Sequence, residues 1–288
     1  MMTSNQKEAI GFIGTGNVGL HMANNLLAAG YPVIAFDTRR EPLEQLAQKG
    51  ATIAASSAEV GELCQIVQVM VATDDQVMEV VGDGECGLSS TLAPGSTVIV
   101  HSTLHPETVQ AAAEVLDSRS VGLLDAPVSG TKGAEASAEN RCMTFMVGGS
   151  VDLLEDCRPL LQVSGKTILH IGPQPGDGQL AKLIANLIGL VTMEAVREGI
   201  AMGRDAGLSI DLLLEVIANS TAACWSAENW HHIRSMPERH PGGGEGLAEL
   251  GHKDLSHACA LAWKIGTPVP LAALASQLLE RPFGSEEY

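Results

Sequence analysis

The chain has 288 residues, enough for one large or two ordinary domains, and its hydrophobic content of 45% is typical of a globular protein rather than a disordered one. Its formal charge of -17 disfavours binding to nucleic acid and to anionic membranes, because both depend on clustered lysine and arginine. Aromatic residues make up only 3%, so the core consists mainly of Ala, Val, Leu and Ile, which suits a parallel sheet packed closely against helices.

The N-terminus and the cysteines bear on the cellular compartment. Residues 1–16 contain no basic segment followed by an apolar one, so we expect no signal peptide. The six cysteines are scattered along the chain with no CxxC pair. This distribution is typical of buried thiols in a reducing compartment and argues against a disulfide framework. We therefore predict a cytoplasmic protein.

The first chemical motif follows the first predicted strand. Residues 9–13 form a short apolar run that predicts a buried strand, and the next six residues read Gly14-Thr15-Gly16-Asn17-Val18-Gly19. An amphipathic helix follows and ends at Gly30. A strand, a GxGxxG sequence and a helix in this order are typical of a dinucleotide-binding turn.

Each glycine of this motif has a separate expected role. Gly14 permits the tight turn, Gly16 lets the backbone approach a pyrophosphate, and Gly19 lets the helix pack closely on the strand. The N-terminus of the helix that follows carries partial positive charge, which attracts the anion, and Asn17 and Val18 are further candidate cofactor-binding residues.

An acidic residue stands where such a site needs one. A second predicted strand, residues 32–36, ends in Asp37, where the adenosine ribose requires a hydroxyl acceptor. A carboxylate there repels a 2'-phosphate, so Asp37 favours NAD over NADP. Arg39 and Arg40 follow directly and leave open the alternative that they hold that phosphate.

Strands and helices then alternate as far as residue 172. Further apolar runs predict strands, and these runs are 66–71, 97–100, 123–124, 144–147 and 167–171. This alternation predicts an α/β fold with a doubly wound sheet, on which ligands bind beyond the carboxyl ends of the strands. Polar segments follow three of these strands at that edge: Thr73-Asp74, Ser102-Thr103 and Ser129-Gly130.

A break in the pattern predicts a domain boundary. The segment 173–178 reads PQPGDG, and only helical patterns follow it. We predict a dinucleotide-binding domain over 1–172 and an all-helical domain over 173–288, beginning with one long helix over 176–205. Because that helix contains Lys182 and Glu194, a buried helix is a better interpretation than a membrane span. We interpret the glycine-rich segment 240–246 as a mobile loop.

Lys182 and Asn186 are the strongly polar residues in an apolar part of this helix. Their spacing of four places them on one face, about one turn apart. Hydride transfer to a carbonyl leaves negative charge on oxygen, which a positioned ammonium stabilises and then protonates. Burial lowers the pKa of a lysine toward the operating pH. Lys182 is therefore a candidate acid/base, although spacing alone also fits a lysine whose stem is buried while its head reaches water.

Other polar groups carry weaker signals. Ser129 and Gly130 follow a strand, where they form either an anchor for a substrate carboxylate or a simple turn. The nine histidines include no HExxH motif and have no cysteine or acidic partners at ligand spacing, so we predict no metal site.

Four ordered segments together resemble one known family, the β-hydroxyacid dehydrogenases. That family includes 3-hydroxyisobutyrate dehydrogenase, tartronate semialdehyde reductase and the glyoxylate/succinic semialdehyde reductases, with 6-phosphogluconate dehydrogenase as a larger relative. The segments are similar to its cofactor, substrate-binding, catalytic GxxxKxxxN and C-terminal KDL signatures, and they are residues 11–19, 125–130, 178–186 and 253–255. The resemblance covers nearly the whole chain.

The resemblance implies a Rossmann domain followed by an all-helical domain, and a homodimer or homotetramer built through the helices. It implies that Lys182 is the general acid/base, that Asn186 is its partner at the substrate, and that Ser129 and Gly130 anchor a carboxylate. Thr131 stands where a second glycine is usual and reshapes that anchor. Further implied site residues are, on the cofactor side, Thr73, Asp74, Thr103 and Lys253, and, lining the substrate pocket, Trp225.

The predicted function is that of an NAD(P)-dependent oxidoreductase that interconverts a short, anionic 3-hydroxy acid and its semialdehyde, with 3-hydroxyisobutyrate as the model. One alternative is a reductase of glyoxylate, succinic semialdehyde or tartronate semialdehyde. Alternatives of another kind are a catalytically silent cofactor-binding scaffold and an imine reductase. Lys182 argues against both, because relatives of those kinds have lost or replaced the lysine.

Overall fold

The computed structural model describes residues 7–82, 86–240 and 242–279. The chain divides into two compact units, residues 1–182 and 183–288. The predicted boundary at residues 172 and 173 lies in the turn before the long helix, whereas this division falls after Lys182, within that helix. The reason is that the first turns of the helix are hydrogen-bonded to the strand ends of the first unit.

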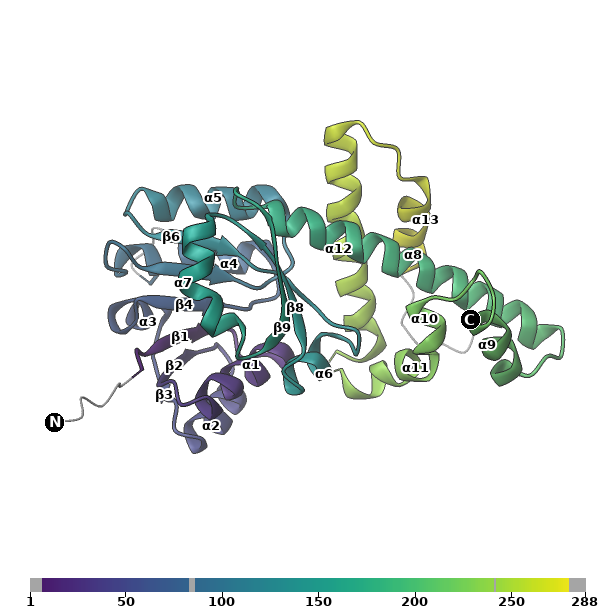
Figure 1. Ribbon diagram of the computed structural model, residues 1–288, viewed down its shortest axis with the longest axis horizontal. Helices are drawn as coiled ribbons and strands as arrows, with labels where there is room; N and C mark the ends of the chain where they lie inside the picture. Colours follow the sequence, from purple (N-terminus) through teal and green to yellow (C-terminus); the bar gives the residue numbers. More distant parts are fainter. Residues whose placement is uncertain (1–6, 83–85, 241, 280–288) are drawn as a thin grey trace. The chain divides into compact units, whose positions relative to one another are not determined.

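The first unit is built on a nine-stranded sheet (Figure 1). Its strand order is β3-β2-β1-β4-β5-β6-β8-β7, with β9 paired to β8. The strands are β1 Ile10–Ile13, β2 Val33–Phe36, β3 Thr52–Ile53, β4 Ile66–Val69, β5 Thr97–Val100, β6 Gly122–Asp125, β7 Val128–Ser129, β8 Met143–Gly148 and β9 Gly165–Gly172.

Five parallel strands end in register at one edge of this sheet. The paired last residues, from β2 through β1, β4 and β5 to β6, are Phe36, Ile13, Val69, Val100 and Asp125. The loops that follow these strands therefore meet at the same edge, where the sequence predicts the polar segments to gather.

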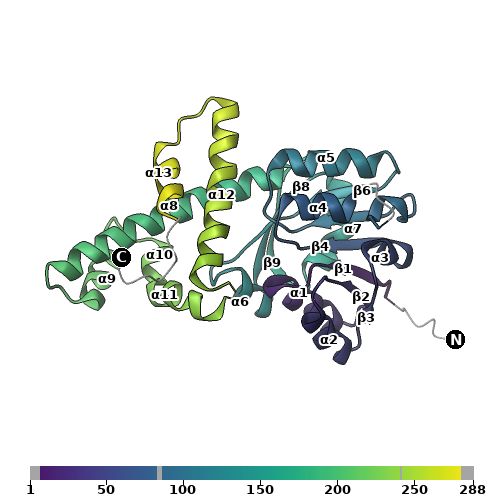
Figure 2. The same cartoon turned by 180° about the vertical axis from the view of Figure 1, so that it is seen from behind.

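Helices cover both faces of the sheet, which confirms the predicted doubly wound fold. They are α1 Asn17–Ala28, α2 Arg40–Gln48, α3 Ser57–Leu63, α4 Asp74–Val81, the 3-10 turn η1 Leu88–Ser90, α5 Pro106–Asp117, α6 Ala134–Glu139 and α7 Val151–Leu161. One apolar core joins the sheet to α1, α2, α6 and α7, and a second joins it to α3, α4 and α5. Thus α7 lies in front of the sheet in Figure 1, and α3 and α4 lie in front of it in Figure 2.

The far part of the sheet differs from a purely parallel arrangement. β8 runs antiparallel to both β6 and β7. β9 runs parallel to β8, and the helix α7 connects these two strands. Only Ala126 and Pro127 separate β6 from β7, too short a connection for a helical crossover. The two-residue strands β3 and β7 carry no periodic signal and were not predicted.

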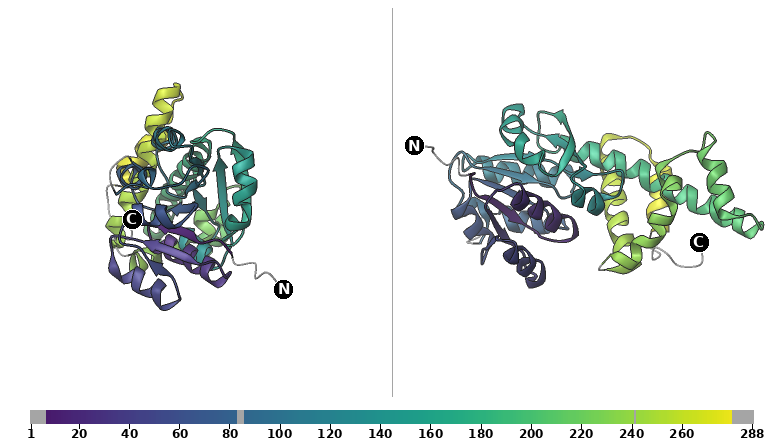
Figure 3. Two further views of the ribbon diagram at one scale, coloured as in Figure 1. Left: turned by 90° about the vertical axis from the view of Figure 1, so that its left-hand side faces the viewer. Right: turned by 60° about the horizontal axis from the view of Figure 1, so that its bottom comes forward.

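The second unit is formed of helices throughout its described residues (Figure 3). The long helix α8 Asp177–Asp205 enters it, and the others are α9 Ile210–Ala218, α10 Trp225–Glu228, α11 Trp230–Arg239, α12 Gly243–Ile265 and α13 Pro270–Leu278. The loop interpretation of residues 240–246 was wrong from Gly243 onward, because α12 begins there. Three glycines at and near the first turn concealed this helix start. Pro241 lies outside the described residues.

The long helix α8 is less buried than the sequence suggested. By length and composition it meets the criterion for a membrane span, which is weak evidence by itself. Only 33% of its most apolar 18-residue window is buried within the chain, so the interpretation as a buried helix holds for a minor part of that surface.

Candidate active site

The glycine-rich turn has the geometry that its sequence predicts. Gly14 has a φ of +88°, and a Cβ there would collide with the backbone carbonyl of Met70. A Cβ on Gly19 would collide with the carbonyl of Gly14, so α1 packs so closely on the end of β1 that no side chain fits at this position. A Cβ on Gly16 would meet Nη2 of Arg39 at 3.2 Å and no backbone atom, so the approach of a ligand to this backbone is open.

Asp37 ties this turn to the end of β2. Its Oδ2 accepts hydrogen bonds from the Thr15 amide at 2.6 Å and the Thr15 hydroxyl at 3.1 Å, and its Oδ1 accepts one from the Arg39 amide. The Arg39 guanidinium lies 3.2 Å from Oδ1. Burial raises the pKa of Asp37, but the hydrogen bonds from Arg39 and Thr15 outweigh burial and lower the pKa below its ordinary value. Asp37 is therefore a carboxylate at neutral pH.

These residues fit a dinucleotide. No side chain caps the N-terminus of α1, so its first amides are available to a pyrophosphate. The carboxylate at Asp37 stands at the end of the neighbouring strand, as the ribose hydroxyls require. Asn17 and Val18 are the first two residues of α1 and present these amides.

Two more predicted cofactor residues begin the next helix. The hydroxyl of Thr73 caps α4 by accepting a hydrogen bond from the Gln76 amide. Oδ1 of Asp74 accepts from the His105 amide at 2.9 Å and from the Thr108 hydroxyl at 2.6 Å. Asp74 thus links the starts of α4 and α5, next to the segment that contains Thr103.

The predicted carboxylate anchor packs against a short helix. Ser129 ends β7 and pairs with Thr144 of β8. A Cβ on Gly130 would collide with the side chain of Ser137 on α6, so a glycine is required there for packing alone. Thr131 is exposed at the turn that leads to α6. Ser129 therefore stands on a paired strand rather than on a free loop.

Lys182 lies in a part of α8 that is fixed to the sheet edge. It is buried, with 8% of its surface exposed. The fully buried Asp125, at the end of β6, accepts hydrogen bonds from the Gly176 amide at 3.0 Å and the Gln179 amide at 2.8 Å, and so caps this helix. Gln179 in turn bonds to the backbone of Ser102 and Leu104. Lys182 follows Gln179 by three positions, so the two residues share one helical face.

In the second unit, Asn186 is hydrogen-bonded to α12. Its Nδ2 donates to Oδ2 of Asp254 at 2.6 Å. Nζ of Lys253 lies 3.3 Å from Oδ1 of the same carboxylate, in an ion-pair contact. The predicted residues Asn186 and Lys253 are therefore connected through Asp254, which fixes the orientation of the Asn186 amide.

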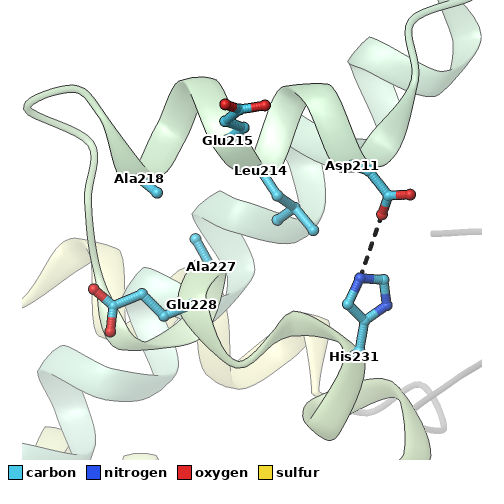
Figure 4. A pocket seen from close by; sticks show the side chains of 7 residues that line it. All are labelled: Asp211, Leu214, Glu215, Ala218, Ala227, Glu228 and His231. Carbon is cyan, nitrogen blue, oxygen red and sulfur yellow. Dashed lines mark ion pairs between the residues drawn. The ribbon is translucent and has the colours of Figure 1, made fainter.

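Trp225 and a nearby cavity lie on other helices of this unit. Trp225 is the first residue of α10 and is 38% exposed. A cavity of about 320 Å³ opens between α9, α10 and α11, lined by Asp211, Leu214, Glu215, Ala218, Ala227, Glu228 and His231 (Figure 4). His231 and Asp211 lie 3.4 Å apart there, with most of both side chains in solvent. This cavity contains none of the predicted site residues, and solvent screens its charges.

Comparison with known proteins identifies the family. A family model described as the NAD binding domain of 6-phosphogluconate dehydrogenase matches residues 9–172, and one described as NAD-binding of NADP-dependent 3-hydroxyisobutyrate dehydrogenase matches residues 176–285. A mitochondrial protein of Dictyostelium discoideum, described as a probable 3-hydroxyisobutyrate dehydrogenase, is 36% identical over 96% of this chain and 86% of its own length. The chain belongs to the β-hydroxyacid dehydrogenase family.

Two further members of the family are similar along most of their length. The NAD-dependent L-serine dehydrogenase of Pseudomonas aeruginosa is 34% identical, with 93% of this chain and 90% of that enzyme covered. A solved structure of Mycobacterium tuberculosis 3-hydroxyisobutyrate dehydrogenase with L-serine superposes with a TM-score of 0.80 at 28% identity, and covers 95% of this chain and 92% of that one. The predicted family resemblance and the predicted fold are both confirmed.

Sequence reasoning missed three polar residues that contact the predicted site residues or the segments that contain them. Asp125 caps α8, Gln179 joins α8 to the segment after β5, and Asp254 orients Asn186. All three lie inside the four family signatures, so their place in a motif could have identified them as candidate residues of the site. The partners of Asp125 and Gln179 lie 51 to 77 residues away in sequence, and no spacing rule reveals such contacts.

His101 stands just before Ser102 and Thr103, and its contacts give it a structural role. Its ring is fully buried, with Nδ1 2.9 Å from the Ala126 carbonyl and Nε2 2.9 Å from Oε1 of Gln68. Burial lowers the pKa of His101 to about 4, although the bond to Ala126 raises it. The ring is therefore neutral at physiological pH and joins β4, β5 and β6 at their carboxyl ends.

Proposed function

We propose that this protein interconverts a short 3-hydroxy acid, 3-hydroxyisobutyrate or a close analogue, and the matching semialdehyde, using NAD(P). The observation that carries the proposal is Lys182, a buried lysine in a helix segment capped by Asp125, one turn before Asn186. Members of the family with 3-hydroxyisobutyrate dehydrogenase names match nearly the whole chain, which supports the same reaction type.

The proposed roles follow from the chemistry of each group. A bound nicotinamide coenzyme supplies the hydride acceptor. Lys182 takes the proton from the substrate hydroxyl during oxidation and returns it to the carbonyl oxygen in reduction. Asn186, oriented by Asp254, donates its remaining amide hydrogen to that oxygen. Ser129 and the backbone at Gly130 bind the substrate carboxylate.

The remaining proposed roles concern the coenzyme and the pocket. The amides of Gly16, Asn17 and Val18 hold the pyrophosphate at the start of α1. Residues beside the nicotinamide are Thr73, Asp74 and Thr103, and Lys253 contacts the coenzyme. Trp225 is proposed to line the substrate pocket, and Thr131, in place of a second glycine, is proposed to alter the space at the carboxylate anchor.

L-Serine is a second candidate substrate. It is also a 3-hydroxy acid, and it occurs in the names of one related enzyme and one related structure. Purified protein should be assayed with 3-hydroxyisobutyrate, L-serine and glycerate, and with glyoxylate, succinic semialdehyde and tartronate semialdehyde in reverse, each with NAD(H) and NADP(H). We expect the highest kcat/KM for 3-hydroxyisobutyrate. Absence of coenzyme-linked turnover with the whole panel contradicts the proposal and favours a silent scaffold.

We propose that NAD is the preferred coenzyme, because Asp37 is ionised and directly follows β2, where a carboxylate is expected to face the adenosine ribose and to repel a 2'-phosphate. Asp37→Ala is expected to raise the NADP/NAD ratio of kcat/KM by about tenfold or more, since like charges about 4 Å apart repel by ~1–4 kcal/mol near a protein surface. Glu41→Ala, which removes one exposed negative charge from α2, serves as the matched control and leaves the ratio unchanged. A wild-type enzyme that prefers NADP overturns this reading and assigns the 2'-phosphate to Arg39.

We also propose a homodimer or homotetramer built through the helical unit. α9 is apolar along most of its surface, yet none of its residues is buried within the chain. Leu212 and Val216 are each 63% exposed, and Met202 near the end of α8 is 74% exposed. A helix of this composition is normally buried, and a second copy of the chain provides such burial.

The oligomer is tested by light scattering on the purified protein. Leu212→Glu with Val216→Glu is expected to convert the assembly to monomers, because two carboxylates are too costly to bury in an apolar interface. Leu63→Glu introduces the same charge at an exposed leucine of the first unit and leaves the assembly intact. A wild-type protein that is monomeric at micromolar concentration contradicts this proposal.

The proposed compartment is the cytoplasm, with no membrane or nucleic-acid partner. All six cysteines are free thiols, which suits a reducing compartment. Only Cys64 and Cys157 are buried, so the expectation of six buried thiols was wrong for the other four, and Cys86 is exposed. Several relatives are named mitochondrial, and cell fractionation followed by immunoblotting separates the two locations.

A further inference from the structure

Gln179 joins the catalytic helix to the segment that follows β5. Its side chain is fully buried. Oε1 accepts a hydrogen bond from the Leu104 amide at 2.9 Å, and Nε2 donates one to the Ser102 carbonyl at 3.0 Å. One primary amide therefore satisfies a backbone donor and a backbone acceptor on either side of Thr103.

Further hydrogen bonds hold both sides of this junction, the start of α8 and the segment after β5. The backbone amide of Gln179 donates to the buried carboxyl of Asp125, and the Ser102 hydroxyl accepts a hydrogen bond from the Val71 amide at 2.9 Å. A Cβ on Gly178 would collide with the Met146 carbonyl, so the first turn of α8 lies directly on the sheet. This junction has no room to shift without breaking a hydrogen bond or an apolar contact.

We propose that Gln179 is a positioning residue for the proton-transfer step: its two side-chain hydrogen bonds hold Lys182 in register with the backbone at Thr103. This inference rests on the proposed role of Lys182 as the acid/base. Because its side chain is fully buried and both its polar atoms are bonded to backbone, Gln179 acts through the helix that carries Lys182, one turn further on. A displacement of about 1 Å at such a site lowers a rate by about 100-fold.

The pairing of one donor with one acceptor makes the inference testable. Gln179→Met has a similar length but no hydrogen-bond donor and only a weak acceptor, so at every pH it loses the bond to Ser102 and most of the bond from Leu104. The hydrogen bonds of the Gln179→Glu side chain depend on pH. An ionised carboxylate can only accept, so it cannot bond to the Ser102 carbonyl that it faces. A protonated carboxyl accepts from the Leu104 amide and donates to the Ser102 carbonyl. Because the position is buried, the pKa of a carboxyl placed there rises toward neutrality.

We expect Gln179→Met to lower kcat by about 10- to 100-fold, with a change of less than about threefold in KM for the coenzyme, whose main contacts lie at the glycine-rich turn. Relative to wild type, the deficit of Gln179→Met is constant from pH 5 to 8. The deficit of Gln179→Glu is large at pH 8 and shrinks as the pH falls and the new carboxyl becomes protonated. Asp125 titrates in all three proteins, so each variant is compared with wild type at the same pH.

Thermal unfolding of each variant and the turnover of Lys182→Ala complete the experiment. If Lys182→Ala is inactive while Gln179→Met has the kcat of wild type, Gln179 does not position Lys182 and the proposed function stands. If Gln179→Glu and Gln179→Met have the same deficit at every pH, packing rather than hydrogen bonding explains the residue, and the inference fails. If Lys182→Ala turns over like wild type, the proposed function and this inference fail together.

Discussion

Replacing Lys182 with alanine is expected to reduce kcat by about 10²- to 10⁴-fold, the contribution of a positioned general acid or base, while NAD still binds. Lys182 lies in the segment of α8 that Asp125 and Gln179 fix to the sheet edge, so the backbone that carries this lysine has a defined position. The glycine-rich turn that we propose as the pyrophosphate site belongs to a separate element, the start of α1. Steady-state assays and titration of NAD by protein fluorescence measure the two properties separately.

Two companion variants sharpen this test. Lys182→Met retains the apolar stem and removes the amine, so equal losses in Lys182→Ala and Lys182→Met assign the effect to proton transfer rather than to a cavity. Lys166→Ala removes an exposed lysine of β9 and is expected to leave kcat unchanged. Wild-type turnover in Lys182→Met contradicts the mechanism.

Replacing Asp125 with alanine is expected to lower the free energy of unfolding by about 2–5 kcal/mol. The change leaves the amides of Gly176 and Gln179 without acceptors in a buried place, and each such donor costs about 1–3 kcal/mol. Urea unfolding followed by circular dichroism measures the loss. Asp152→Ala, at an exposed acid in the first turn of α7, is the control and changes the stability by less than about 0.5 kcal/mol. A loss below about 1 kcal/mol in Asp125→Ala contradicts the capping role.

The same carboxyl predicts how stability varies with pH. Burial raises the pKa of Asp125 from its ordinary value of 3.8 to about 6, against the lowering effect of the bonds from Gly176 and Gln179. Between these values the folded protein binds more protons than the unfolded chain, so this group makes the protein less stable as the pH rises from about 4 to about 6. The full effect is about 3 kcal/mol.

Asp125→Asn isolates this contribution because asparagine does not titrate. The difference in unfolding free energy between wild type and Asp125→Asn is expected to fall across that pH window and to be constant above it. A difference that instead grows with pH means that the hydrogen bonds, rather than burial, dominate the pKa of Asp125.

The parts of the fold that the sequence predicted are those with local signals. The strands that end at Ile13, Phe36 and Val100 are short apolar runs closed by polar or glycine residues. The turn at Gly14 follows from a backbone conformation that favours glycine, which has a φ of +88° there. The long helix was predicted within one residue of its observed start at Asp177.

The features that the sequence did not predict also have physical reasons. The two-residue strand β7 is too short to show a period, and it exists only because β8 lies beside it. The start of α12 at Gly243 contains residues that disfavour a helix, which its later packing overrides. The exposed apolar surface of α9 had the pattern of an ordinary helix in the sequence, and only the structure revealed that this chain alone does not cover it.

The sequence by itself determined the order of the motifs, the residue types available for chemistry, and the spacing that places Lys182 and Asn186 one turn apart. These properties follow from covalent order and from the period of a helix, which act over a few residues. Only the tertiary structure decided that Gln179 bonds on both sides of Thr103 and that Asp254 orients Asn186. Those partners are separated by 68 to 77 residues, and strand register and helix packing bring them together.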